Sequence, residues 1–322
     1  MWVARLFACL LLAASYVGTA WPQAWPAKPV HVIVPFAAGG STDQLTRFVA
    51  TKLATALGQP VVVENVLGAG GSIGLERLAR SAPDGYTLGT SANTLQAIAP
   101  HLGKLPYDTV KSFTPIGTLA GFAFALIVGP NTQIVSLADL IAKARQDPGK
   151  ISAASAGVGT GIHMAAVLLS QSTGAPFNIV QYKGSGAALG DLIGGHVDFT
   201  FEVIGSAMPH ISSGKTKIIA TTGTRRHPLL PNVPLVAESI PGFEFVGWFA
   251  LFGPAGLPTD VTRRLNDELG KIHRSEEFRN YLETRGYDIL PGSAGDLAGQ
   301  IQRELAKWGD VVKKIPEATL RQ

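Results

Sequence analysis

The chain has 322 residues, of which 46% are hydrophobic and 16% charged, so it can form two folded domains of about 150 residues each and is not a disordered chain. Its net charge of +4 includes 27 basic residues that are spread along the sequence. Proteins that bind nucleic acids gather such residues on one face, so this spread argues against a nucleic-acid partner.

The first twenty residues have the pattern of a secretory signal peptide. Arg5 precedes an apolar stretch at 6–17 and small residues follow at 18–20, so we expect cleavage after Ala20 and export of the mature protein. Cys9 is the only cysteine and would leave with the signal; lipid attachment there is the alternative, but only eight residues precede it. No later segment offers the roughly 20 consecutive apolar residues of a transmembrane helix.

Strand and helix patterns alternate in the first part of the sequence. The predicted elements are a strand at 30–34, a helix that ends at residue 57, a strand at 61–64, a short helix that ends at residue 80 and a strand at 86–90. Ser41, Thr42 or Asp43 can cap the first helix, and Gly58 ends it. Such alternation with short turns indicates a parallel sheet flanked by helices.

A second α/β unit begins near Val135. Ser136 and Asp139 form a capping box for its first helix. The elements that follow are strands at 151–154, 178–181, 197–201 and 217–221, with helices at 163–173 and 185–193.

The last third of the chain has too few strands for a sheet of its own. It offers a strand at 248–252 and helices at 259–274, 276–284 and about 294–314. We therefore expect this tail to return to the first unit, so that the chain crosses between units near 124–130 and near 248–253 and forms a hinge. The predicted lobes are 21–126 with 250–322, and 127–249.

Fragments that resemble catalytic motifs are incomplete. The seven histidines have no metal-binding spacing, and we expect neither a metal nor a cofactor. Ser155 lies between a strand and a helix as a hydrolase nucleophile does, with alanine in the first place of the motif. Its histidine and aspartate partners cannot be placed from sequence, so a secreted α/β hydrolase that uses Ser155 stays an alternative to the non-catalytic protein that we expect.

Two glycine-containing loops follow predicted strands and open predicted helices. The first contains Phe36, Ala37, Ala38, Gly39, Gly40, Ser41, Thr42 and Asp43, and the second contains Ser155, Gly157, Val158, Gly159 and Thr160. Glycine lets backbone N–H groups turn toward a ligand, and a helix N-terminus carries a partial positive charge, so each loop can bind an anionic oxygen without a basic side chain. Ligands of open α/β sheets bind beyond the carboxyl ends of the strands, where both loops lie. Such loops also occur simply as turns.

Side chains near the loops are further candidates, each with a structural alternative. Asp198 ends a predicted strand at the cleft and can hold a ligand ammonium group or make a structural hydrogen bond. His163 faces the site or packs in the core, Lys183 attracts an anion or is solvated, and Asp43 contacts the ligand or caps its helix. The remaining candidates are Ala69, Ser91, Asn93 and Ser185, together with Phe36, Phe201 and Trp248, aromatic residues that line the cleft or belong to the core.

Short motifs run in order through the mature chain. In the first half they are Pro26-x-Lys28-Pro29-Val30, Ile33-Val34-Pro35-Phe36, Gly39-Gly40-x-x-Asp43, Gly58-Gln59-Pro60-Val61-Val62-Val63-Glu64-Asn65, Gly68-Ala69-Gly70-Gly71, Pro83-Asp84-Gly85-Tyr86-Thr87-Leu88 and Leu105-Pro106-Tyr107-Asp108. In the second half they are Pro148-Gly149-Lys150, Tyr182-Lys183-Gly184, Asp191-Leu192-Ile193-Gly194-Gly195-x-Val197-Asp198, Pro231-x-Val233-Pro234 and Pro254-Ala255-Gly256-x-Pro258. The series resembles the tripartite tricarboxylate transporter receptor family, the Bug-type periplasmic solute-binding proteins.

This resemblance implies the two-lobed α/β fold of periplasmic binding proteins, closing on a small carboxylate held by the two loops, partly through ordered water, with no chemistry performed. We therefore expect a monomeric periplasmic receptor that delivers a mono-, di- or tricarboxylate, or a carboxylate-bearing aromatic or amino acid, to the membrane components of a tripartite transporter. A ligand-sensing partner of a membrane kinase is another alternative. Ala38, 152–154 and 160–164 depart from the family pattern, which leaves the identity of the carboxylate open.

Overall fold

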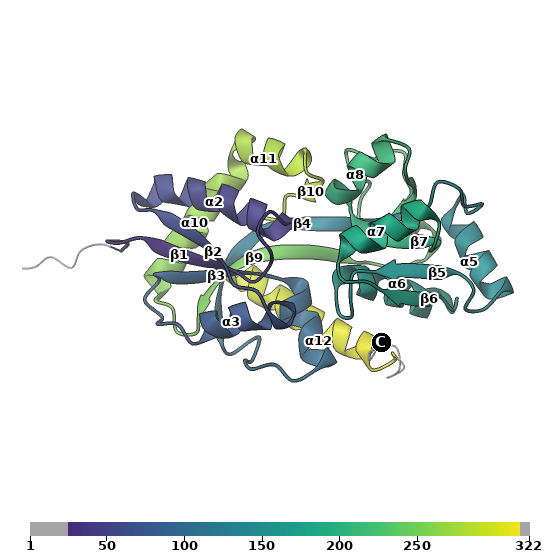
Figure 1. Cartoon of the computed structure of the whole chain (residues 1–322). Helices are drawn as coiled ribbons and strands as arrows, with labels where there is room; N and C mark the ends of the chain where they lie inside the picture. Colours follow the sequence, from purple (N-terminus) through teal and green to yellow (C-terminus); the bar gives the residue numbers. More distant parts are fainter. Residues whose placement is uncertain (1–24, 316–322) are drawn as a thin grey trace, which may run out of the picture.

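The computed structural model describes residues 25–315. The predicted signal peptide at 1–20, including Cys9, lies outside the described residues. Figure 1 shows two α/β halves side by side, joined by long central strands, with helices packed on the strands of each half. No helix within residues 25–315 is long and apolar enough to cross a membrane.

The first half is built on three parallel strands. β1 (Val30–Val34) lies between β2 (Val61–Asn65) and β3 (Thr87–Ala92). The connections contain α2 (Ser41–Leu57) and α3 (Ser72–Ala79). Four of the five residues of β1 are buried, because helices cover both faces of the sheet, and this burial explains the continuous apolar run that predicted the strand.

The second half repeats this arrangement with β5 (Ser152–Ser155), β6 (Asn178–Gln181) and β7 (Phe199–Val203) in parallel. β5 lies between the other two strands. The remaining elements of this half are α5 (Leu137–Gln146), α6 (Gly161–Thr173), α7 (Ser185–Gly194), α8 (Ile204–Ser212), β8 (Lys217–Thr221) and α9 (Val236–Ser239).

The longest strand, β4 (Phe113–Val128), joins the two halves and is missing from the sequence-based prediction. It pairs with β9 (Val246–Pro254) over residues 113–123 and with β7 and β8 over residues 124–128. The register with β9 shifts near Pro115 and again a few residues later, so the segment lacks the regular alternation by which a strand is predicted. The whole sheet runs β2-β1-β3-β9-β4-β7-β5-β6.

The crossing points differ from the expected ones. The pairing of β4 changes between Ala123 and Phe124, at the start of the expected segment 124–130. The second crossing precedes β9, because Phe249–Phe252 pair with β3 inside the first half; the expected segment 248–253 was therefore wrong. Whether 127–249 moves as a lobe against 21–126 and 250–322 stays a prediction.

The C-terminal tail returns to the first half, as expected. α10 (Thr259–Arg274) packs on α2 and β4, α11 (Glu276–Glu283) follows it, and β10 (Tyr287–Asp288) pairs with β4. α12 (Ala294–Val312) packs on β4 and on the π-helical turn η3 (Thr94–Ile98). Its last turn also reaches the second half, where the Gln171 amide donates a hydrogen bond of 3.1 Å to the Val311 carbonyl oxygen.

Candidate ligand-binding site

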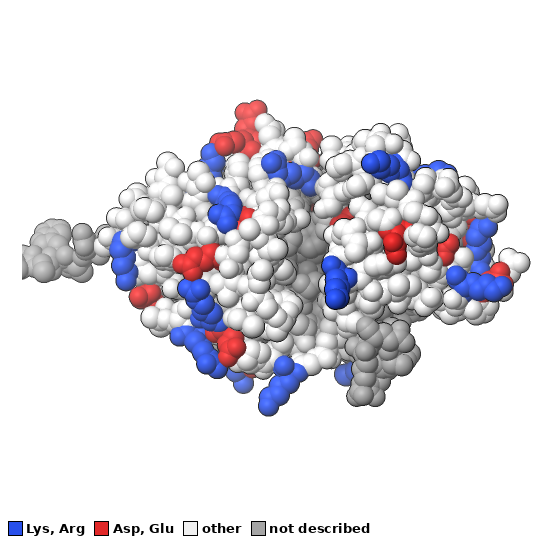
Figure 2. Space-filling model, viewed as in Figure 1, with Lys and Arg blue, Asp and Glu red and all other residues white. Residues whose placement is uncertain are grey.

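The carboxyl ends of the parallel strands meet at a cleft between the two halves. Figure 2 shows the surface hollowed along the line where the halves meet. After β1 the chain forms loop A (residues 36–43), and after β5 it forms loop B (residues 155–160). Each loop leads into a helix, α2 in the first half and α6 in the second.

A cavity of about 480 Å³ lies in this cleft and is bounded by both loops. Among the predicted site residues, those that line it are Phe36, Thr42, Ala69, Val158, Gly159 and Thr160. Residues that were not predicted complete the wall, chiefly Leu95, Leu102, Phe122, Phe124, Val203 and Phe249. Sequence reasoning missed the phenylalanines because β4 was not predicted and its pairing with β9 was therefore not foreseen.

Loop A is held in shape by Asp43. Its side chain is buried and accepts hydrogen bonds from the Gly39 N–H (2.8 Å), the Arg47 guanidinium (3.0 Å) and the Asn65 amide (2.9 Å). Burial alone would raise the pKa of Asp43, but the hydrogen bonds from Arg47, Gly39 and Asn65 outweigh it and hold the pKa below its usual value. Asp43 is therefore already fully engaged with loop A and its neighbours.

The N-cap of α2 differs from the expected one. Gly40 occupies it without a side-chain cap, and Ser41, Thr42 and Asp43 form the first turn. The first N–H groups of a helix have no acceptor within it, so this turn presents N–H groups at the cleft. Ala37, Ala38, Gly39 and Gly40 are exposed beside the cavity and are not among the residues that line it.

Loop B is held by three short-range contacts. Thr160 is the N-cap of α6, accepting from the His163 N–H at 3.3 Å and donating to the Gly157 carbonyl oxygen at 2.7 Å. The Gly159 N–H donates to Nδ1 of His163 at 3.2 Å. Burial lowers the pKa of His163 to about 4, so the ring is neutral at physiological pH and can accept this hydrogen bond.

Ser155 is buried at the start of loop B. Its hydroxyl lies 3.3 Å from both the N–H and the carbonyl oxygen of Gly157. The structure brings no histidine into hydrogen-bond contact with this hydroxyl among residues 25–315. The geometry thus makes Ser155 part of the loop's internal bonding and does not assemble the triad that a hydrolase needs.

Asp198 lies at the opposite edge of the sheet. It precedes β7 and accepts hydrogen bonds of 2.7 Å from both the N–H and the hydroxyl of Ser152, the first residue of β5. Because β5 and β7 are parallel, this is the amino edge, whereas the cleft lies at the carboxyl edge. The expectation that Asp198 ends a strand facing the cleft was wrong, and its structural alternative is correct.

The other candidates lie outside the cavity lining. Lys183 is exposed, and Ser185 begins α7. Phe201 and Trp248 are fully buried core residues. Ser91 and Asn93 are buried behind the wall that η3 forms, where Ser91 accepts a hydrogen bond of 3.2 Å from Gln96.

A buried glutamate near the cleft also escaped the sequence reasoning. Glu202 lies on β7 and is only 4% exposed, and one of its carboxylate oxygens accepts the N–H of Val203 at 2.9 Å. Burial raises the pKa of Glu202 to about 7, although Val203 and the Ser185 hydroxyl both favour the charged form. The sequence feature that could have revealed it is a single glutamate within the otherwise uncharged strand 199–203.

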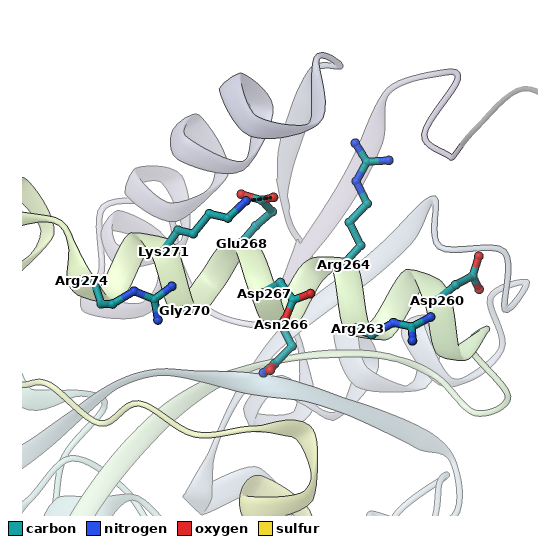
Figure 3. A pocket seen from close by; sticks show the side chains of 9 residues that line it. All are labelled: Asp260, Arg263, Arg264, Asn266, Asp267, Glu268, Gly270, Lys271 and Arg274. Atoms are coloured by element: carbon teal, nitrogen blue, oxygen red, sulfur yellow. Dashed lines mark hydrogen bonds and ion pairs between the residues drawn. The ribbon is translucent and has the colours of Figure 1, made fainter.

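A second hollow, on α10, has a different character. Figure 3 shows charged side chains projecting from this single helix, among them the Glu268–Lys271 ion pair at 2.8 Å. Its lining residues all belong to α10. With no strand end, loop or residue of the second half, this surface lacks the enclosure of a ligand site.

Fold and site together define a two-lobed α/β binding protein with its cleft at the carboxyl ends of two parallel sheets. The family model described as tripartite tricarboxylate transporter family receptor matches residues 45–316. The chain belongs to this receptor family, whose members are solute-binding proteins.

Individual relatives cover nearly the whole chain. Protein BugT of Bordetella pertussis is 33% identical over 316 residues, covering 96% of this chain and 97% of the relative. Among solved structures, Rpa4515 of R. palustris with adipate superimposes with a TM-score of 0.82 at 32% identity, covering 90% of this chain and 97% of that one. MatC of Rhodopseudomonas palustris with bound malate has a TM-score of 0.79 at 32% identity, covering 89% and 100%.

Proposed function

We propose that this chain is a periplasmic receptor that captures a small carboxylate between its halves and delivers it to the membrane components of a tripartite transporter. The observation that carries the proposal is that Thr42, in the first turn of α2, and Thr160, the N-cap of α6, line one cavity from opposite halves. Two helix N-termini there offer N–H groups and partial positive charge to one anion. The relatives solved with adipate and malate support a carboxylate as that anion.

Loops A and B do the binding in this proposal. The backbone N–H groups of loops A and B that have no acceptor inside the loops, chiefly those of the first turn of α2 and of Val158, bind the carboxylate directly or through water. Asp43, Ser155 and His163 keep the loops in shape through the N–H groups that they accept. Charge-assisted hydrogen bonds contribute about 1.5–3 kcal/mol each. Several of them would supply the roughly 8 kcal/mol of micromolar binding after the cost of closure.

Closure around the ligand is the proposed mechanism. The halves already approach each other at loop B, because a Cβ placed on Gly159 would lie 2.6 Å from the Leu102 side chain of the first half. Ligand contacts made by both halves stabilise the closed form over the open one. The transporter then recognises the closed surface of a monomer, and no covalent step is involved.

Thermal unfolding of the mature protein with a panel of acids tests the proposal. Mono-, di- and tricarboxylates are compared with their neutral amides and with sugars. A ligand at about 100 times its Kd stabilises the folded state by about 2.7 kcal/mol, so we expect at least one acid to raise Tm while its amide does not. If no acid raises Tm, or an amide matches its acid, carboxylate capture is the wrong function.

A further inference from the structure

The side chains around the cavity are far more apolar than a site for a multiply charged acid requires. Aromatic rings enter from loop A, from β4 and from β9, as Phe36, Phe122, Phe124 and Phe249. Phe122 and Phe249 stack with ring centroids 4.7 Å apart, and Phe124 meets Phe122 edge-on at 5.5 Å. Phe122, Phe124 and Phe249 form a continuous aromatic wall where the two halves join, and Phe36 adds a fourth ring to the lining from loop A.

Charged side chains are nearly absent from the lining. Lys104 is the one charged residue among the lining residues within 25–315, and its side chain is exposed to solvent. The polar side chains of the lining are hydroxyls, on Thr42, Ser72, Thr94 and Thr160. Two of these begin the helices that the proposed function assigns to the carboxylate.

We infer, on the basis of the proposed function, that the site selects a monocarboxylate whose remaining body is apolar. The one carboxylate takes the N–H groups of loops A and B, and the body packs on the aromatic wall. A second carboxylate would be buried against phenylalanine and leucine. Lys104, the one cation of the lining within residues 25–315, is exposed to solvent, so the water lost by that carboxylate is poorly replaced, which opposes binding. A body of one ring or about six carbons suits the cavity of about 480 Å³.

Matched pairs of acids test this inference by isothermal titration calorimetry. Hexanoate and adipate have the same chain length, and benzoate and terephthalate the same ring; within each pair they differ only in the second carboxylate. We expect each monoacid to bind at least about tenfold more tightly than its diacid, a difference of about 1.4 kcal/mol. Diacids that bind as tightly as the monoacids, or more tightly, would overturn the inference and leave carboxylate capture intact. Failure of all four acids, and of malate, would instead contradict the proposed function.

A pair of phenylalanine variants locates the body of the ligand. Phe36→Leu removes a half-buried ring from the cavity lining, and Phe177→Leu removes a half-buried ring that packs on Phe199 away from it. We expect the Kd for the tighter monoacid to rise about fivefold in Phe36→Leu and to stay unchanged in Phe177→Leu. An unchanged Kd in both variants would contradict packing of the apolar body on this wall.

Discussion

Trp248 and Glu304 connect β9 to α12 inside the first half: the indole N–H donates to the glutamate Oε1 at 2.6 Å. The Gln300 amide donates to the same oxygen at 3.0 Å. Asn93, which lies between the cavity-lining residues Ala92 and Thr94, is buried, and neither polar atom of its side chain has a hydrogen-bond partner within residues 25–315. Because α12 packs on η3, whose residues Thr94 and Leu95 line the cavity, the bonds of Glu304 to Trp248 and Gln300 support one wall of the cleft from behind.

Trp248→Phe should destabilise the protein. It removes a hydrogen bond to the buried carboxyl group of Glu304, and such bonds contribute about 1 kcal/mol to a neutral acceptor and up to about 3 kcal/mol to a charged one. Urea unfolding measures the change, with Tyr281→Phe as the control, because the buried Tyr281 hydroxyl has no partner within residues 25–315 and its removal should cost nothing. An equal change in unfolding free energy in the two variants would show that the hydrogen bond from Trp248 to Glu304 does not contribute to stability.

The contribution of Glu202 to stability should fall as pH rises past the carboxylate range, whereas the lowered pKa of His163 makes its contribution rise with pH over the same range. In the folded protein the pKa of Glu202 is raised from 4.5 to about 7. The proton that this carboxyl keeps therefore favours the folded state fully below pH 4.5, and the benefit is lost as pH rises to about 7. A difference of this size corresponds to about 3 kcal/mol.

Glu202→Gln isolates that effect, because the amide oxygen can still accept the Val203 N–H. We expect the unfolding free energy of the variant, relative to that of the parent protein, to rise by up to about 3 kcal/mol between pH 4.5 and 8. Glu244→Gln, at an exposed glutamate, should leave the profile unchanged. If the unfolding free energy of Glu202→Gln depends on pH as that of the parent does, residues other than Glu202 cause the pH dependence.

Asp43→Asn should loosen loop A. The amide replaces an oxygen that accepts hydrogen bonds with a donor facing other donors, so we expect a loss of about 2–3 kcal/mol and weaker binding of whichever acid the parent binds. Asp147→Asn is the control, since Asp147 forms only an exposed ion pair with Lys150 at 3.2 Å, worth less than about 1 kcal/mol.

The pH dependence of this contribution has the opposite sign to that of Glu202. Because the pKa of Asp43 is lowered in the folded state, its stabilisation is present above pH 3.8 and is lost as pH falls through the lower folded value. The unfolding free energies of the parent and of Asp43→Asn should therefore become equal at low pH. A difference between the two that stays constant as pH falls would contradict this role of Asp43.

Gly161→Ala should narrow the cavity at the start of α6. The added methyl would lie 2.6 Å from the ring of Phe124, which also lines the cavity, so the ring must shift. We expect the ligand Kd to rise at least about tenfold, measured by isothermal titration calorimetry. Gly186→Ala on α7, where a Cβ meets nothing within 4 Å, is the control, and restored affinity in Gly161→Ala combined with Phe124→Leu would confirm the contact.

Local patterns predicted the elements that form from local interactions. β1, α2, β6, β8 and α10 have the predicted ends or nearly so, since β-branched runs, apolar spacing and glycine stops are set within a few residues. Ser136 caps α5 as predicted, with its hydroxyl accepting the Asp139 N–H at 3.1 Å. The Asp139 side chain accepts the Val135 N–H at 3.1 Å and not that of Ser136, so the capping box is only half formed. The same reasoning missed β4, because its partners come from three distant parts of the chain.

The candidate site likewise has features that local sequence predicts and features that depend on distant parts of the chain. Glycine loops after strands pointed to loops A and B from sequence, because strand direction alone fixes which edge of a parallel sheet a loop occupies. Asp198 was misplaced because it was taken as the end of a strand, although it lies near the start of the strand predicted at 197–201 and directly precedes β7.

The sequence by itself determined the two α/β units, the two glycine loops and, through its ordered motifs, the receptor family. The tertiary structure decided which side chains surround the cavity, above all Phe122, Phe124 and Phe249. It also decided that Asp43 and His163 accept hydrogen bonds from N–H groups of their own loops. The physical reason is that loop geometry depends on a few adjacent residues, whereas the chemistry of a cleft depends on residues brought together from strands more than a hundred positions apart.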